Sequence, residues 1–239
     1  MKVCLVIPCY NEEKRLDIQS FVEFAKENDH YDLLFVNDGS MDKTIQILEE
    51  LSKNHHNIES LDLKKNQGKA EAVRLGFLHG VNKGIYDYIG FWDADLATPC
   101  SELKNFDTIL VKNQFEIVMG SRVLRLGGMI ERKWYRHLLG RLFATVASVS
   151  LKLPVYDTQC GAKFFKANII EHLFNEKFIS YWIFDVEILF KYTRAEKNAL
   201  KKIYELPLNE WRDVAGSKLS FFDFFKAPIE LINICRRYK

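Results

Sequence analysis

The chain has 239 residues, a formal net charge of +2, 48% hydrophobic residues and 28% charged residues. This composition is typical of a globular protein with a well-buried core, and it excludes disordered and fibrous classes. The small net charge gives no indication of nucleic-acid binding, so we expect no nucleic-acid partner. No Gly-, Ser- or Pro-rich linker divides the sequence, which favours a single domain over residues 1–239.

The five cysteines are scattered and form no CxxC pair, as is typical of reduced thiols in the cytoplasm. The N-terminus begins a strand directly and lacks the apolar core and cleavage site of a signal peptide. The most apolar stretch, 138–155, is interrupted by Arg141 and Lys152, whereas a membrane span needs about 20 apolar residues. We therefore expect a cytoplasmic protein without a transmembrane helix.

Short apolar runs alternate with segments of helical periodicity through the first half of the chain. The alternation predicts βαβ units, and hence an α/β fold with a doubly wound, mainly parallel sheet and helices on both faces. The predicted strands are 3–7, 33–36, 58–63, 88–92 and 117–119, and the predicted helices are 12–28, 42–53, 69–82 and 102–112.

The alternation ends after about residue 122, which indicates that the second half adds a different structure to the sheet. In chain order we expect a basic stretch, a helix at 137–152, a Gly-containing run at 157–166, a helix at 183–194, a strand at 202–206 and a Phe-rich helix at 219–235.

Polar residues follow the predicted strands, and ligands of doubly wound sheets bind beyond the carboxyl ends of the strands. Pro8 to Glu12 follow the first strand and residues 37–40 follow the second. Asp38 and a main-chain carbonyl near Pro8 offer acceptors for the base and ribose of a nucleotide. Alternatively, Asn11 is a helix cap and residues 38–40 form a capping turn.

Asp93 and Asp95 leave the predicted strand at 88–92. Two carboxylates at a strand end can hold a hard divalent cation, Mg²⁺ or Mn²⁺, that bridges a diphosphate, although an isolated D-x-D pattern is common. Lys69 begins a predicted helix directly after Gly68, a place from which it can reach a phosphate, and the alternative is an exposed loop lysine. The Walker A pattern is absent.

A strongly basic segment spans residues 122–141, where Glu131 is the only acid. Guanidinium groups suit phosphate oxygens, and the apolar face of the helix predicted at 137–152 suits a lipid surface. The alternative is a solvated basic face. The basic residues are Arg122, Arg125, Arg132, Lys133, Arg136 and Arg141.

Several motifs in order resemble the family-2 inverting glycosyltransferases, and within them the polyprenyl-phosphate sugar transferases. They are IPCYNE at 7–12, NDGSMDKT at 37–44, NQGKAEAVRLGF at 66–77, DADLATP at 93–99 and GSR at 120–122. Later segments are similar to the dolichyl-phosphate glucosyltransferase branch: DTQCGAKFF at 157–165, WIFDVEIL at 182–189 and EWRDVAGSKL at 210–219.

The resemblance implies a GT-A type fold and transfer of a hexose, namely glucose from UDP-glucose, to a polyprenyl phosphate of the dolichyl type. Trp211 precedes GSK where the mannosyl branch usually has an Arg, which favours UDP-glucose. The chain departs from the family in having Asn37 where DDG is usual and in lacking the membrane anchor of many eukaryotic members.

The resemblance also implies roles for individual residues. Pro8, Asn11 and Glu12 line the nucleoside pocket, Asp38 contacts base or ribose, and Asp93, Ala94 and Asp95 serve the diphosphate, with both aspartates binding the metal. Lys69 approaches a phosphate, and Arg122 and Arg136 receive the lipid phosphate together with Arg141 of the basic segment. Asp185 and Glu187 are the candidate catalytic carboxylates, which orient sugar or acceptor, because a phosphate acceptor is already largely dianionic at pH 7.

We accordingly expect a nucleotide-sugar-binding half at 1–122, an acceptor-binding half at 123–218 and an amphipathic C-terminal helix at 219–239. The expected location is peripheral, at the cytoplasmic face of a membrane. The alternatives are a transferase to a saccharide hydroxyl, a GDP-mannose-using polyprenyl-phosphate mannosyltransferase, a nucleotidyltransferase and a non-catalytic nucleotide-sugar binder.

Overall fold

The structure, a computed structural model, describes residues 1–131, 134–214 and 221–238, without the side chains of residues 135, 136 and 221–225. The chain forms two compact units, and each is built from two segments. The first unit comprises residues 1–96 and 162–177, and the second comprises residues 97–161 and 178–239. The first segment of the first unit ends at Leu96, and the functional division of the chain at residue 122 stays a prediction.

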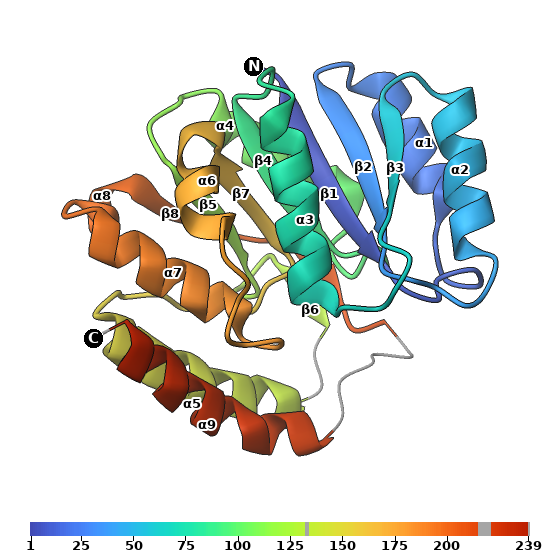
Figure 1. The fold of residues 1–239 in the computed structure, drawn as a ribbon. Coiled ribbons are helices and arrows are strands. Elements are labelled where there is room, and N and C mark those ends of the chain that lie inside the picture. The colour runs from blue at the N-terminus through green and yellow to red at the C-terminus, as the bar shows by residue number, and fades with distance from the viewer. Residues whose placement is uncertain (132–133, 215–220, 239) are drawn as a thin grey trace. The chain divides into compact units, whose positions relative to one another are not determined.

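The first unit contains a sheet with the strand order β3-β2-β1-β4-β7 (Figure 1). Its first four strands in the chain are parallel, and β7 is antiparallel to β4. Cys9 pairs with Asn37, and Asn37 pairs with Asp62, so the carboxyl ends of three strands lie at one edge. The strands are β1 (Val3–Cys9), β2 (Tyr31–Asn37), β3 (Ile58–Asp62), β4 (Tyr88–Trp92) and β7 (Ala162–Lys166).

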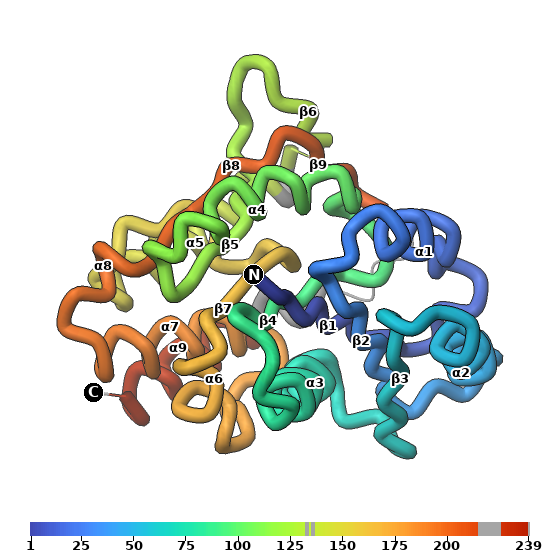
Figure 2. Tube along the Cα trace, turned by 90° about the horizontal axis from the view of Figure 1, so that it is seen from above, coloured from blue at the N-terminus to red at the C-terminus, as the bar shows by residue number. Residues whose placement is uncertain are grey.

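Helices cover both faces of this sheet, as predicted (Figure 2). Consecutive residues of β2 show the alternation, because Phe35 packs edge-on against Phe21 of α1 while Val36 faces Gly76 of α3. A Cβ at Gly76 would lie 2.5 Å from Val6 Cγ1, so the glycine lets α3 approach the sheet closely. The helices are α1 (Ile18–Glu27), α2 (Thr44–Asn54), α3 (Lys69–Asn82) and α6 (Ala167–Phe174).

Arg74, which forms a buried ion pair within α3, also joins α3 to α6. Arg74 donates to both carboxylate oxygens of Glu71, and its Nη1 donates to the Phe174 carbonyl oxygen at 3.0 Å. The hydrogen bond from Arg74 lowers the pKa of Glu71. Phe77 stacks on Phe174 with ring centroids 4.4 Å apart. Charge pairing and apolar packing therefore hold the helix whose first residue is Lys69.

The second unit combines two pairs of parallel strands with several helices. The strands are β5 (Ile117–Ser121) with β8 (Ile203–Pro207), and β6 (Met129–Glu131) with β9 (Glu210–Arg212). The helices are η1 (Cys100–Glu102), α4 (Leu103–Leu110), α5 (Trp134–Leu151), α7 (Phe184–Ala195), α8 (Ala199–Lys202) and α9 (Phe221–Arg237).

Helix α5 turns its small residues inward and its large apolar residues outward. Ala144 and Ala147 are buried, whereas Leu142 and Val149 are 64% and 74% exposed. α5 and α9 lie side by side and line a common groove of about 360 Å³ (Figure 1). None of the helices in the described part of the chain is both long and apolar enough to cross a membrane.

Candidate functional site

The loop after β1 is tied to the loop after β2 by Asn11. Its backbone has φ of 50°, in the left-handed region that asparagine tolerates better than most residues. Its side-chain oxygen accepts from the Met41 N–H at 2.8 Å, and its own N–H donates to Ser40 Oγ at 3.0 Å. Asn11 therefore shapes the edge of the sheet where the sequence predicts the nucleoside pocket.

Glu12 and Pro8 are two further residues predicted to line this pocket, and each pairs with a residue of a neighbouring segment. The Glu12 N–H donates to Thr44 Oγ1 at 2.8 Å, and its buried carboxylate pairs with Arg15. Pro8 lies in β1 opposite Val36 of β2. Their predicted contacts with a nucleoside stay predictions.

Asp38 holds the loop that leads into α3. Its buried carboxylate accepts the N–H groups of Gln67 at 2.7 Å and Gly68 at 2.8 Å. Gly39, with φ of 63°, allows the two loops to meet, because a Cβ there would lie 2.4 Å from the Asn66 nitrogen. The interactions of Asp38 seen in the structure thus form the loop, and its predicted contact with base or ribose stays a prediction.

Asn37 stands where the resemblance leads us to expect an aspartate, and its neighbour Asp62 explains the difference. The Asn37 side-chain amide donates to Asp62 Oδ1 at 2.8 Å. An ionised aspartate cannot donate, and it would place a second negative charge beside Asp62. The amide therefore replaces a repulsion with a hydrogen bond between the ends of β2 and β3.

Lys69 and Asp93 lie together, as expected from their positions after the strands. Lys69 Nζ donates to Asp93 Oδ1, and it also lies 5.7 Å from the centre of the Phe91 ring. Ala94 is buried, and the Leu96 N–H donates to the Asp93 carbonyl at 3.2 Å, which closes a tight turn. Leu96 has φ of 51°, a strained conformation for this residue of the kind that is concentrated at functional sites.

The turn from Asp93 to Leu96 also fits a divalent cation. No group of three Asp, Glu, His or Cys side chains suited to a metal occurs in the part of the chain that the structure describes. Mg²⁺ at nucleotide sites, however, needs only one or two carboxylates, because phosphates and water complete its coordination. Asp93 and Asp95, both partly exposed, satisfy that requirement.

In the second unit, Arg122 is held by Asp157. Its Nε and Nη2 donate to the two carboxylate oxygens at 2.6 and 2.8 Å, and its backbone N–H donates to the same carboxylate at 3.1 Å. The guanidinium carbon lies 5.3 Å from the centre of the Trp211 ring. Since a bidentate pair fixes the plane of the guanidinium, Arg122 has one defined orientation.

Arg141 meets the residue next to Asp157. Its Nη1 donates to the Tyr156 carbonyl at 2.8 Å, and its guanidinium carbon lies 3.5 Å from the centre of the Tyr156 ring. Arg136 is a residue of α5, but its side chain lies outside the described part of the structure. Two of the three predicted acceptor arginines thus contact consecutive residues of one loop.

Two buried hydroxyls adjoin the pair of Arg122 and Asp157 in the sequence. Ser121 Oγ and Thr158 Oγ1 have no hydrogen-bond partner among the described residues, and these residues are 0% and 1% exposed. An unsatisfied buried hydroxyl costs about 1–3 kcal/mol. Each such group in a native structure calls for an explanation, and a bound oxygen-rich ligand is one that can be tested here.

The two candidate catalytic carboxylates, Asp185 and Glu187, lie in the first turn of α7 and are buried. Glu187 accepts from the N–H groups of Ile179 and Ser180 at 2.8 and 3.1 Å and from the Tyr238 hydroxyl at 2.9 Å. Burial raises the pKa of Glu187. These contacts give Glu187 a structural task, to hold residues 179–180 and the end of the chain.

Comparison with known proteins identifies the family of the chain. The model of the family described as "Glycosyl transferase family 2" matches residues 4–174. The chain is 32% identical to dolichyl-phosphate beta-glucosyltransferase ALG5D of Trichomonas vaginalis over 99% of this chain and 74% of the relative. The proteins named dolichyl-phosphate beta-glucosyltransferase of Saccharomyces cerevisiae and Drosophila melanogaster are 31% and 29% identical, over 98% and 100% of this chain and 74% and 76% of theirs.

Solved structures agree on the fold. Glucosyl-3-phosphoglycerate synthase of Mycobacterium tuberculosis, in complex with Mn²⁺, UDP and glucosyl-3-phosphoglycerate, is similar with a TM-score of 0.69. The similarity covers 98% of this chain and 80% of the synthase at 16% identity. The GT-A type fold predicted from the sequence is confirmed.

Thr158→Val tests whether the unsatisfied hydroxyl is kept for a ligand. Removal of a buried hydroxyl without a partner should raise the free energy of unfolding by about 1 kcal/mol or more. Thr193→Val is the matched control, because the Thr193 hydroxyl donates to the Phe190 carbonyl at 3.2 Å and its loss should lower stability. Thermal unfolding and transfer activity are measured together. Equal destabilisation by both variants, or full activity of Thr158→Val, would contradict the interpretation.

Proposed function

The chain belongs to glycosyl transferase family 2, and we propose that it transfers glucose from UDP-glucose to a polyprenyl phosphate of the dolichyl type, with inversion at the anomeric carbon. The observation that carries the acceptor is the pair Arg122 and Arg141, which contact consecutive residues of one loop. The relatives named above, similar over nearly the whole chain, support both glucose and the lipid phosphate.

A phosphate acceptor simplifies the chemistry that the protein must supply. A phosphate monoester is largely dianionic at pH 7, so its oxygen attacks the sugar without a general base. A saccharide hydroxyl would need a carboxylate base, and Glu187 is instead engaged by two N–H groups and a hydroxyl. We propose that Asp185 orients the sugar or the acceptor, and that Glu187 acts through the segment it holds.

The donor, in this proposal, lies at the carboxyl edge of the first unit's sheet. Asn11, Glu12 and Asp38 form the walls of the nucleoside pocket through the loop contacts described above. Lys69, which now pairs with Asp93, brings a positive charge to the place proposed for the diphosphate. Trp211 beside Arg122, in place of the arginine usual in the mannosyl branch, favours UDP-glucose over GDP-mannose.

Asp93 and Asp95 would hold a divalent cation, Mg²⁺ or Mn²⁺. When bound, such a cation supplies positive charge to the departing nucleoside diphosphate. The mycobacterial synthase of similar fold, which was crystallised with Mn²⁺ or Mg²⁺ and UDP, supports this assignment. In this proposal the protein contributes two carboxylates on a tight turn, with Lys69 beside Asp93.

We further propose that the protein lies on a membrane surface through an α5–α9 face of exposed apolar side chains. The face would insert among lipid tails while the nearby Arg236 and Arg237 meet anionic headgroups. The side chains of Phe221, Phe222, Phe224 and Phe225, predicted for the same contact, lie outside the described residues, as does Lys239. The face consists of Trp134, Leu138, Leu142, Val146, Val149, Ile229 and Ile232.

The membrane face concerned is the cytoplasmic one in this proposal. Among the described residues no disulfide bond joins the five cysteines, and reduced thiols are typical of the cytoplasm. Cys4 is also unreactive, because burial raises the pKa of its thiol to about 12.

A donor and acceptor panel tests the proposed reaction. The protein is incubated with UDP-glucose, other UDP-sugars and GDP-mannose, each with a short polyprenyl phosphate or a saccharide, and products are identified by mass spectrometry. We expect a glucosyl phospholipid and UDP, with UDP-glucose preferred by at least about tenfold. Preference for GDP-mannose would support the mannosyl alternative, transfer to the saccharide would support a hydroxyl acceptor, and binding without turnover would support a non-catalytic binder. A separate reaction with UTP and a sugar 1-phosphate tests for a nucleotidyltransferase, which would release pyrophosphate.

Asp95→Ala tests the cation site. Loss of a metal ligand on the diphosphate should lower kcat about a hundredfold or more, since metal stabilisation of a leaving group is worth several kcal/mol. The fold should be unaffected, because Asp95 is partly exposed. Glu49→Ala, at an exposed position of α2, is the control and should keep full activity. Full wild-type activity in excess EDTA would contradict the assignment.

Vesicle flotation tests the α5–α9 face. We expect binding to vesicles with anionic lipid at low salt, and a loss of at least about tenfold in Leu142→Gln/Val149→Gln, because two apolar side chains lose their burial in lipid. Ile85→Gln/Val111→Gln is the matched control, since these side chains are 58% and 67% exposed outside the face. Absence of binding at low salt, or equal loss in both double variants, would rule the face out.

A further inference from the structure

We propose that Glu205 is a positioning residue for the acceptor phosphate, because it fixes the loop that holds Arg122 and Arg141. Glu205 lies in β8 and belongs to none of the motifs that indicated a transferase. The proposal rests on the function proposed above, since it assigns Glu205 to the acceptor side of that reaction.

The Glu205 carboxylate binds two consecutive peptide groups of the loop. The Tyr156 N–H donates to Oε1 and Oε2 at 3.0 and 2.8 Å, and the Asp157 N–H donates to Oε1 at 2.6 Å. Hydrogen bonds to an ionised acceptor are roughly twice as strong as those between neutral groups. One side chain on a strand thus determines the position of both residues.

The same two residues hold the arginines through their other groups. The Tyr156 carbonyl and ring bind Arg141, and the Asp157 carboxylate binds Arg122. Asp157 also accepts the Gln159 N–H at 3.0 Å, which stiffens the loop beyond it. A displacement of Tyr156 and Asp157 would therefore move both guanidinium groups at once.

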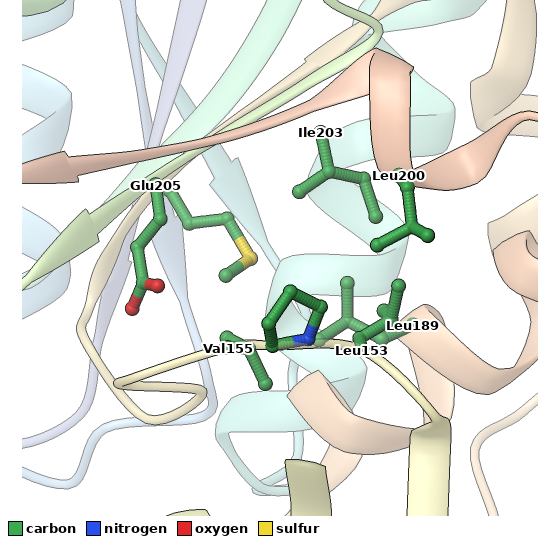
Figure 3. Close-up of a pocket in the computed structure, with 8 residues that line it drawn as sticks. Leu153, Val155, Leu189, Leu200, Ile203 and Glu205 are labelled. Atoms are coloured by element: carbon green, nitrogen blue, oxygen red, sulfur yellow. The ribbon is translucent and has the colours of Figure 1, made fainter.

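Apolar packing does not fix this loop by itself. A pocket of about 80 Å³ is lined by Leu153, Pro154 and Val155, and Figure 3 shows Leu153, Val155 and the Glu205 carboxylate among its lining side chains. Side chains that line a pocket lack packing partners on that side, so packing contributes less to holding this part of the loop. The remaining lining residues are Met119, Leu189, Leu200 and Ile203.

The test compares Glu205→Ala and Glu205→Gln with Glu116→Ala. Glu116 is the control, because it makes similar bonds near the start of β5, to Tyr192 and Lys202, but none to the loop. We expect Glu205→Ala to lower kcat/KM for polyprenyl phosphate about ten- to a hundredfold, mainly through KM, with UDP affinity within about twofold of wild type. Glu205→Gln keeps one acceptor oxygen and should recover part of the loss.

Amide hydrogen exchange supplies a readout that does not depend on the reaction. The Tyr156 and Asp157 amides should lose protection in Glu205→Ala and keep it in Glu116→Ala. If wild type does not use polyprenyl phosphate but the amides behave in this way, the proposed function fails and the positioning role stands. Protection that persists in Glu205→Ala, or a fall in donor affinity equal to that in acceptor use, would overturn the proposal.

Discussion

The loops on which this molecule depends are each held by one carboxylate, which accepts two consecutive main-chain N–H groups. Hydrogen bonds to an ionised carboxylate are charge-assisted, and each carboxylate fixes two peptide planes at once. The loops so fixed lead into α3, carry the arginine-binding residues, precede α7 and begin β9. Within the described part of the chain these carboxylates include Asp38 on Gln67 and Gly68, Glu205 on Tyr156 and Asp157, Glu187 on Ile179 and Ser180, and Glu102 on Asn209 and Glu210.

Because carboxylates have this structural role, the function of an acidic residue is difficult to assign from the sequence. A carboxylate after a strand is the right group both for a ligand hydroxyl and for a pair of N–H groups, and the two uses leave the same local pattern. The sequence assigns Asp38 and Glu187 to substrate. In the structure their oxygens accept backbone N–H groups, and their contacts with substrate stay predictions. The sequence indicates no role for Glu205 or Asp157, because their hydrogen-bond partners lie 48 and 35 residues away in the chain.

The structural features that could be predicted from the sequence are those determined by residues close together in the chain. β4 and α3 begin and end at the predicted residues. The apolar run that forms β4 ends directly before Asp93, and α3 starts directly after Gly68. β7 was seen only as a Gly-containing run, since five residues bounded by glycine and lysine show no clear period. The pairing of Lys69 with Asp93 follows from one rule, that the ends of parallel strands meet at one edge.

Several large apolar residues of α5 are exposed, whereas the loops are held by contacts within the protein. A helix that faces water on one side normally turns its large apolar residues to the core, because their burial there lowers the free energy most. Along much of α5 this order is reversed, with Ala144 and Ala147 buried and Leu138, Leu142 and Val149 exposed, although Leu151 at its end is buried. Its exposed stripe costs the isolated protein stability, and that cost is recovered only if another apolar phase covers it. In the proposed function a lipid surface is that phase, because the proposed acceptor is itself a membrane lipid, and the contact that stabilises α5 would also concentrate the enzyme where that acceptor is found.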